Sequence, residues 1–247
     1  LIMSKSKKFK NAALLIIGNE ILSGRTQDKN INYLAKQLFS HGVSLEEVRI
    51  IPDVKPTIIK TVKSLKSNFN YIISTGGIGA THDDITSESI SAALKKDYCL
   101  NKKALKELEK YYKNKSDLTD ARKKMAYMPK GSKIILNKVS GAPGFQIENI
   151  YVFAGIPIIV ESMMKEFLKK IKSNTKIYVK SIKTHFYESI IAERLKNTEL
   201  MFKGVRVGSY PIFDGEFKGV EIVMNSYSKK NITSAFAYLK KELNKKI

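Results

Sequence analysis

The sequence of 247 residues is poor in several residues that mark special classes of protein, with one cysteine, six prolines and no tryptophan. Because the single thiol, Cys99, cannot form an internal disulfide, the chain is not a disulfide-stabilised domain. No apolar run approaches the roughly 18 residues that a membrane span requires. The basic segment before the first apolar run is unlike a secretory signal, so we expect a cytoplasmic protein with no membrane partner.

Acidic residues are also scarce, with 23 Asp and Glu against 44 Lys and Arg, which gives a formal net charge of +21. Such a charge can serve nucleic-acid binding, which would weaken steeply with salt. Nearly all of it comes from lysine scattered over predicted helix surfaces, whereas arginine is preferred for bidentate recognition of phosphate and guanine. We therefore interpret the charge as a compositional bias and expect no nucleic-acid partner.

Strand and helix patterns alternate over residues 11–172, which we expect to form the larger domain. Ala12–Ile17 is a continuous apolar run, as expected for a strand buried on both faces, and Val48–Ile51 and Tyr71–Ser74 are the next two strands. We expect Asp28 to cap the helix that follows the first strand. Strands that alternate with helices predict a parallel, doubly wound sheet, whose ligands bind beyond the carboxyl ends of the strands.

A polar segment near residue 173 separates a smaller region, residues 173–247, and a basic tail at 1–10 precedes the larger domain. The smaller region shows strand, helix, strand, strand and helix patterns in that order, which predicts a small two-layer α+β domain. Within it, Val205–Pro211 is interpreted as a strand that runs into a turn, and Asn231 as the cap of the last helix.

The turn after the third strand is the most informative segment. Its glycines, Gly76, Gly77 and Gly79, allow a sharp turn and a close approach of the backbone to a ligand. Backbone N–H groups there suit a phosphate, and the carboxylates of Asp83 and Asp84 suit a divalent cation. The alternative is a tight connection in which one of these acids only caps the next helix.

Further polar residues fall at the carboxyl ends of the other predicted strands. Gly18, Asn19 and Glu20 follow the first strand, and Asp53 follows the second. Because the carboxyl ends of parallel strands meet at one edge, we predict a single ligand site there. The alternatives are that Glu20 and Asn30 only stabilise the long turn after the first strand and that Asp53 caps a helix.

Motifs with a family resemblance lie in six segments: Gly18–Asn30, Thr75–Thr86, Ala142–Phe145, Gly155–Pro157, Glu188–Ser189 and Gly208–Pro211. They are similar to the N-terminal region of the competence/damage-inducible A (CinA) family and to the small domain that follows it. The resemblance covers nearly the whole chain. It implies a molybdopterin-binding, MoaB/Mog-like fold, which is a three-layer α/β sandwich with a mostly parallel sheet.

The resemblance also implies an activity. CinA-type members cleave nucleotide pyrophosphates such as ADP-ribose with a divalent metal, and related domains cleave FAD. The alternative is a molybdopterin-binding or molybdopterin-adenylylating protein, with molybdopterin as the ligand. The nicotinamide-mononucleotide amidase domain of longer members is not expected, because the sequence ends before it. By analogy with the fold, we expect a homo-oligomer.

For a nucleotide pyrophosphate, the site must hold the phosphates and direct water at one phosphorus, with a Mg, Mn or Co ion. The resemblance makes Asp84 the first candidate for the catalytic and metal-binding acid, with Asp53 second, Asp83 third as a metal ligand, and Glu20 as a catalytic residue that orients water or binds a ribose hydroxyl. The expected ligand-binding residues are Gly18, Asn19, Asn30, Thr75, Gly76, Gly77, Gly79, Thr81, Thr86, Pro143 and Gly144.

Three positions near the motifs receive separate interpretations. Ala80 stands where the family usually has proline, so we expect a less rigid turn. His82 has no partner at metal-ligand spacing and is interpreted as an exposed loop residue rather than a catalytic base. Glu161 comes several residues later than the acid of the family pattern, which removes it from the predicted site.

Overall fold

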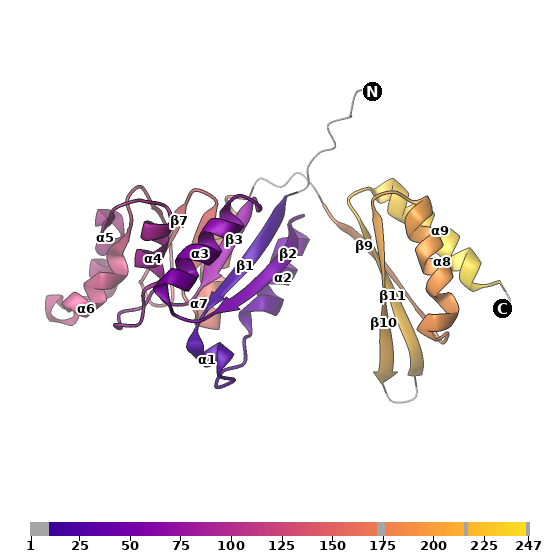
Figure 1. Ribbon diagram of the computed structural model, residues 1–247, viewed down its shortest axis with the longest axis horizontal. Coiled ribbons are helices and arrows are strands. Elements are labelled where there is room, and N and C mark those ends of the chain that lie inside the picture. Colours follow the sequence, from indigo (N-terminus) through magenta and orange to yellow (C-terminus); the bar gives the residue numbers. More distant parts are fainter. Residues whose placement is uncertain (1–9, 172–175, 215–216, 246–247) are drawn as a thin grey trace, which may run out of the picture. The chain divides into compact units, whose positions relative to one another are not determined.

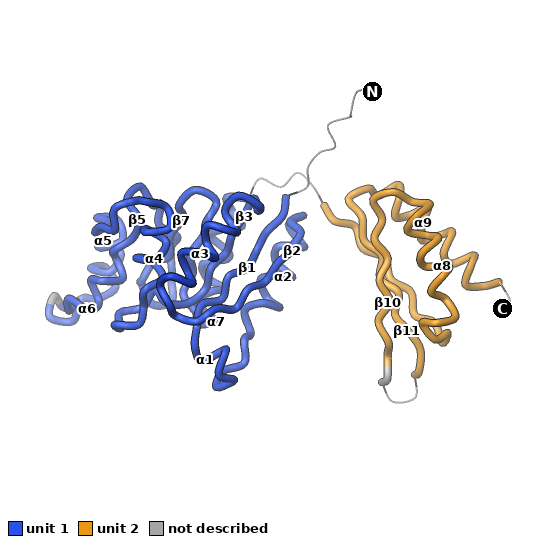
Figure 2. Tube along the Cα trace, in the orientation of Figure 1, with its two compact units in different colours: residues 1–173 blue, residues 174–247 orange. Residues whose placement is uncertain are grey.

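The computed structural model describes residues 10–171, 176–214 and 217–245. The predicted tail at 1–10 therefore lies outside the described residues except for its last position. The chain divides into two compact units, residues 1–173 and 174–247, which Figure 2 shows in separate colours. In the described ranges, no helix is long and apolar enough to cross a membrane.

A six-stranded sheet with the order β2-β1-β3-β8-β7-β6 forms the centre of the first unit. Its strands are β1 (Asn11–Ile17), β2 (Ser44–Ile51), β3 (Tyr71–Thr75), β6 (Lys133–Ile135), β7 (Gly144–Ile147) and β8 (Ile150–Phe153). Neighbours from β2 to β8 are parallel, and β7 and β6 continue the sheet in antiparallel pairing. The mostly parallel sheet confirms the predicted fold class.

Helices cover both faces of this sheet (Figure 1). They are α2 (Asn30–Ser40) and α7 (Pro157–Leu168) on one face, and α3 (Lys55–Lys66), α4 (Thr86–Ala93) and α5 (Lys102–Tyr111) on the other. The alternation of a strand explains the two cores. Leu14 of β1 belongs to the same core cluster as Leu34 and Phe167, whereas its neighbour Leu15 belongs to the cluster that contains Val62 and Ile90. This arrangement is the predicted three-layer sandwich.

Shorter elements complete the first unit: α1 (Asn19–Leu22), β4 (Tyr98–Leu100), η1 (Lys115–Asp117), α6 (Asp120–Lys123), η2 (Lys124–Ala126) and β5 (Tyr127–Pro129). The sequence patterns did not predict β4 and β5, which pair as a separate two-stranded antiparallel sheet. Three-residue strands are too short to show a period, so only their pairing identifies them.

The second unit has a three-stranded antiparallel sheet in the order β10-β11-β9 with two helices on one face (Figure 1). Its elements are β9 (Tyr178–Thr184), α8 (Glu188–Met201), β10 (Val205–Asp214), β11 (Phe217–Ser226) and α9 (Lys229–Leu243). The small C-terminal α+β domain is therefore confirmed. The turn predicted at Pro211 is wrong, because β10 continues through this residue. As β10 is an edge strand, a missing backbone N–H is tolerated there.

Two predicted helix caps have different outcomes. Asp28 accepts the Ile31 amide on its Oδ1 at 2.7 Å and so satisfies a first-turn N–H of α2, although Lys29 directly precedes the helix. Asn231 is not the cap of α9. Ser228 holds that position and accepts the Asn231 amide on its hydroxyl at 3.2 Å. The cap lies three residues earlier than predicted, because the helix begins with two lysines that give no apolar signal of its start.

The tyrosine at the start of β4 gives a pH-dependent test of the packing. Burial, with Glu88 and Tyr127 nearby, raises the pKa of Tyr98 to about 12. The phenol of an unfolded chain titrates near pH 10, so this stabilisation is present below pH 10 and is lost as the pH rises towards 12. We expect the parent protein to lose urea stability relative to Tyr98→Phe between pH 9 and pH 11. A constant difference would contradict the burial of this phenol.

Candidate functional site

The carboxyl ends of four parallel strands meet at one edge of the six-stranded sheet. The Gly18 amide after β1 donates to the Ile51 carbonyl at the end of β2, at 3.2 Å. The Gly76 amide after β3 donates to the Phe153 carbonyl at the end of β8, also at 3.2 Å. These bonds bring together the turns that the sequence predicted to form the site.

Gly76 has a backbone position that no other residue could occupy without displacement of its neighbours. Its φ of 97° is one that L side chains rarely adopt, and a Cβ would lie 2.1 Å from the Ile17 carbonyl oxygen. A Cβ on Gly155, after β8, would lie 3.4 Å from the Gly76 Cα. The predicted phosphate contact of the Gly76 amide is therefore wrong, because the Phe153 carbonyl already accepts from it.

The next four residues present their backbone N–H groups without a protein partner. Within the described chain, the amides of Gly77, Ile78, Gly79 and Ala80 donate to no protein acceptor. These residues are only partly buried, and Gly77 has a φ of 66°. Successive free N–H groups in a turn with a left-handed residue can bind an anion.

The acidic end of the turn is held by hydrogen bonds around Thr81. Its amide donates to Asp84 Oδ2 at 2.9 Å, and its hydroxyl shares its single hydrogen between the carboxylates of Asp83 and Asp84. A Cβ on Gly79 would lie 2.6 Å from Asp84 Oδ2, so the glycine makes room for this carboxylate. Hydrogen bonds from Thr81 and from its own backbone lower the pKa of Asp83. Asp84 stabilises the turn by accepting the Thr81 hydrogen bonds on one carboxylate oxygen, Oδ2.

Asp53 joins the turn after β2 to the turns after β1 and β3. Its Oδ2 accepts the Asn19 amide at 2.9 Å, and its Oδ1 would lie 3.5 Å from a Cβ on Gly77. Burial raises the pKa of Asp53 against the effect of the Asn19 bond, and the negative charges of Glu20 and Asp83 raise it further. The alternative in which Asp53 only caps the next helix is excluded, because α3 begins without a side-chain cap.

The donor set does not make a closed metal site. No three His, Cys, Asp or Glu side chains within the described residues are placed to hold an ion by themselves. Glu20 folds back over Gly18, where a Cβ would lie 2.6 Å from the Glu20 carboxylate, and it stays exposed. One or two carboxylates beside an anion-binding turn fit Mg²⁺, which usually takes its remaining ligands from water and substrate phosphates.

Five other residues that were predicted to contact the ligand are buried. Asn30 is buried and donates to the Gly155 carbonyl at 2.8 Å, and Thr75 and Thr86 are also buried. Pro143 and Gly144 are buried at the start of β7, where a Cβ on Gly144 would lie 2.2 Å from the Val152 carbonyl oxygen. Close packing against β8 therefore explains the glycine at position 144, and its contact with a ligand stays a prediction.

The remaining charged candidates lie elsewhere or face solvent. His82 is exposed, in agreement with its interpretation as a loop residue. Glu161 lines a separate groove along α7. One partner of the turn was missed by the sequence analysis: Lys124 of η2 donates from Nζ to the Thr81 carbonyl at 2.5 Å. A lysine 43 residues away in a lysine-rich helix gives no sequence signal of such a contact.

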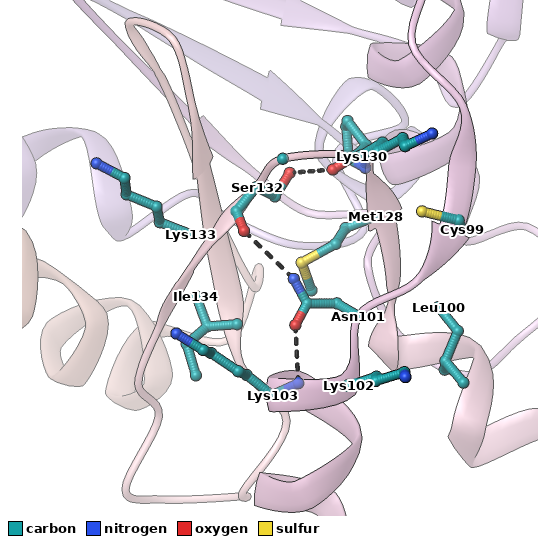
Figure 3. Close-up of a pocket in the computed structure, with 12 residues that line it drawn as sticks. Cys99, Leu100, Asn101, Lys102, Lys103, Met128, Lys130, Ser132, Lys133 and Ile134 are labelled. Carbon is teal, nitrogen blue, oxygen red and sulfur yellow. Dashed lines mark hydrogen bonds between the residues drawn. The ribbon is translucent and has the colours of Figure 1, made fainter.

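A pocket of about 510 Å³ contains none of the predicted site residues. It lies between the start of α5 and the turn after β5, and Asn101 joins its walls by donating to the Ser132 carbonyl at 3.3 Å (Figure 3). Lys103 and Lys133 extend to one side of the view, and Lys102 and Lys130 to the other. Their charges do not converge on one position. The pocket therefore has no arrangement comparable to the turn Gly76–Asp84 after β3, which we call the strand-end turn.

The family follows from comparisons with known proteins. Residues 13–173 match the model described as a probable molybdopterin binding domain. The chain belongs to this molybdopterin-binding domain family. Residues 176–247 match the FAD synthase middle domain. The first match begins within β1 and continues to the end of the larger unit, and it agrees with the predicted resemblance.

Individual relatives of the molybdopterin-binding domain protein agree with this assignment. A Pyrococcus furiosus protein is 32% identical over 243 residues, covering 93% of this chain and 95% of its own. A CinA-like protein of Thermosipho melanesiensis is 30% identical over 241 residues, covering 95% of this chain but 59% of its own. The crystal structure of CinA from Thermoplasma acidophilum, of unknown function, superposes with a TM-score of 0.60 at 30% identity, over 65% of this chain and 98% of that one.

Substitution of Gly76 tests the close approach of the strand ends in the molybdopterin-binding domain. Gly76→Ala combines left-handed strain with a clash against backbone, and we expect a loss of about 3 kcal/mol or more in unfolding free energy. Gly131→Ala is the matched control, because Gly131 has a φ of 87° but no atom within 4 Å of its Cβ position. Strain alone costs about 1–2 kcal/mol there. Equal urea midpoints for the two variants would contradict the close approach.

The raised pKa of Asp53 predicts a gain in stability when its charge is removed. A raised carboxyl pKa means that ionisation opposes folding, an effect absent below the usual pKa and present once the pH exceeds the folded pKa. We expect Asp53→Asn, which can still accept the Asn19 amide, to raise Tm at pH 7 by about 1–2 °C. The gain should shrink towards pH 4. Exposed Asp97→Asn is the control, and a lower Tm for Asp53→Asn would contradict the assignment.

Proposed function

We propose that the strand-end turn is the active site of a divalent-metal-dependent nucleotide pyrophosphatase that cleaves ADP-ribose or FAD-like substrates. The observation that carries the proposal is one edge that combines free backbone N–H groups at Gly77–Ala80 with the carboxylates of Asp53, Asp83 and Asp84. Free amides bind phosphate oxygens, and carboxylates bind the cation that a pyrophosphate brings.

The charges at this edge support a cation site. Burial is the main cause of the raised pKa of Asp53, and the nearby negative charges of Glu20 and Asp83 raise it further. A divalent ion such as Mg²⁺, Mn²⁺ or Co²⁺ removes that repulsion when it binds. Asp53 Oδ1 and the Asp84 oxygen not bonded to Thr81 would hold it, with Asp83 as a further ligand, and substrate oxygens would complete the coordination.

The reaction is attack of water on one phosphorus of the pyrophosphate, with cleavage of the bridging P–O bond. From ADP-ribose the products are AMP and ribose 5-phosphate. When bound, the metal neutralises phosphate charge and lowers the pKa of water. The Gly77–Ala80 amides hold the phosphate in line, and Glu20, which is exposed beside Asp53, orients the attacking water or binds a ribose hydroxyl.

The second candidate is binding or adenylylation of molybdopterin. The family model that matches residues 13–173 is described as a probable molybdopterin binding domain, and this ligand also carries a phosphate for the same amides. The match of residues 176–247 to a FAD synthase middle domain favours the dinucleotide instead. Tight molybdopterin binding without turnover of ADP-ribose or FAD would select the second candidate. A small-molecule ligand is common to both, and a homo-oligomer remains our proposal from the fold.

Release of AMP from ADP-ribose and from FAD, measured by chromatography, tests the activity. We expect AMP only with added Mg²⁺, Mn²⁺ or Co²⁺, and its loss with EDTA. Asp53→Asn and Asp84→Asn should each lower kcat/KM by about 100-fold or more, because each removes a charge that holds the cation. Asp97→Asn, at an exposed ion pair with Lys130, is the control and should leave kcat/KM unchanged.

Two results would overturn the pyrophosphatase proposal. The first is no AMP from either substrate with any of the three metals, using protein whose circular dichroism shows a folded α/β domain. The second is metal-independent AMP release that survives both Asp53→Asn and Asp84→Asn. The first result would favour molybdopterin as the ligand of this site. The second would place the activity outside the strand-end turn.

A further inference from the structure

Lys124 lies against the turn that carries the free amides, although its own element is distant in sequence. Its Nζ donates to the Thr81 carbonyl at 2.5 Å, and Thr81 directly follows Ala80, the last residue of the free amide row. The Lys124 charge also acts on Asp83 and lowers the pKa of that carboxyl, after the hydrogen bonds described above. The ammonium group is therefore held at the end of the anion-binding turn.

The backbone that carries Lys124 is fixed by its neighbours. Ala126 is fully buried, and its carbonyl accepts the Asn101 amide at 2.9 Å, which ties η2 to the start of α5. The guanidinium of Arg122 lies over the Tyr112 ring at 4.5 Å from the ring centre. A lysine on such a segment has only its own side chain left to order when it meets a ligand.

Lys124 acts on the charge of Asp83 from a distance but is not held in an ion pair by the described residues. In the part of the chain that the structure describes, no carboxylate lies within ion-pair distance of it. By contrast, Lys123 pairs with Asp120 at 2.9 Å and Lys55 pairs with Glu88 at 2.5 Å. A lysine ammonium has three donors, and the Thr81 carbonyl uses one of those on Lys124.

Placement, rigidity and free charge point to one role. We propose that Lys124 is a ligand-binding residue that donates to a phosphate group seated on the Gly77–Ala80 amides. Its bond to the Thr81 carbonyl keeps it beside that group before the ligand arrives. The edge otherwise gathers carboxylates, so a fixed cation from η2 lets a phosphate approach an acidic site. This inference rests on the proposed function only for the identity of the phosphorylated ligand.

Calorimetric titration with AMP in the presence of Mg²⁺ tests the proposal without any turnover. Lys124→Met removes the charge and keeps an unbranched side chain one atom shorter, and we expect it to weaken AMP binding about 10-fold. Lys124→Arg should stay within about 3-fold of the parent protein, since it restores a cationic donor. Lys123→Met is the matched control from the adjacent position and should bind AMP like the parent.

Binding of adenosine separates a phosphate contact from a general effect on the turn. With no phosphate, adenosine should bind the parent and Lys124→Met proteins alike, and the Tm of the two should agree within about 2 °C. The proposal is overturned if Lys124→Met binds AMP as the parent does, if it loses adenosine and AMP equally, or if the parent fails to bind AMP. Lys124-dependent AMP binding without ADP-ribose cleavage would keep this inference and reject the pyrophosphatase.

Discussion

The close approach of four strand ends at Gly76 is the constraint on which the site depends. The Gly76 amide is bonded to Phe153, its Cα faces the Ile17 carbonyl, and Gly155 packs against it. Three parallel strands, β1, β3 and β8, are thereby fixed at one point, and β2 is joined through the Gly18 amide. With the edge fixed in this way, the following residues can leave the sheet as a turn whose N–H groups stay free.

The side chains at this edge are acidic, whereas the protein as a whole is strongly basic. A chain with a net charge of +21 places Glu20, Asp53, Asp83 and Asp84 around one turn. Glu88 and Asp120, by contrast, form ion pairs with lysines. Asp53 instead accepts a hydrogen bond from the Asn19 amide, and Asp84 accepts one from the Thr81 amide. These neutral donors hold the two carboxylates in place without removing the negative charge that would attract a cation.

Much of the fold was predictable because it depends on periodic burial. The run Ala12–Ile17 and the alternation of strands with helices predicted a parallel sheet, and the sheet places the turns after β1, β2 and β3 together. Errors fell where local signals are ambiguous. Pro211 was interpreted as a turn because its tolerance depends on β10 being an edge strand. Asn231 was interpreted as the cap of α9, whereas Ser228 holds that position.

The sequence by itself determined the architecture and the edge where polar residues collect, because hydrophobic periodicity and glycine placement are local properties. Only the tertiary structure decided which groups at that edge are occupied and which are free. It assigned the Gly76 amide to Phe153, left the amides from Gly77 onward without a partner and brought Lys124 to Thr81. Hydrogen bonds between segments tens of residues apart depend on the packing of whole elements, and no local pattern records them.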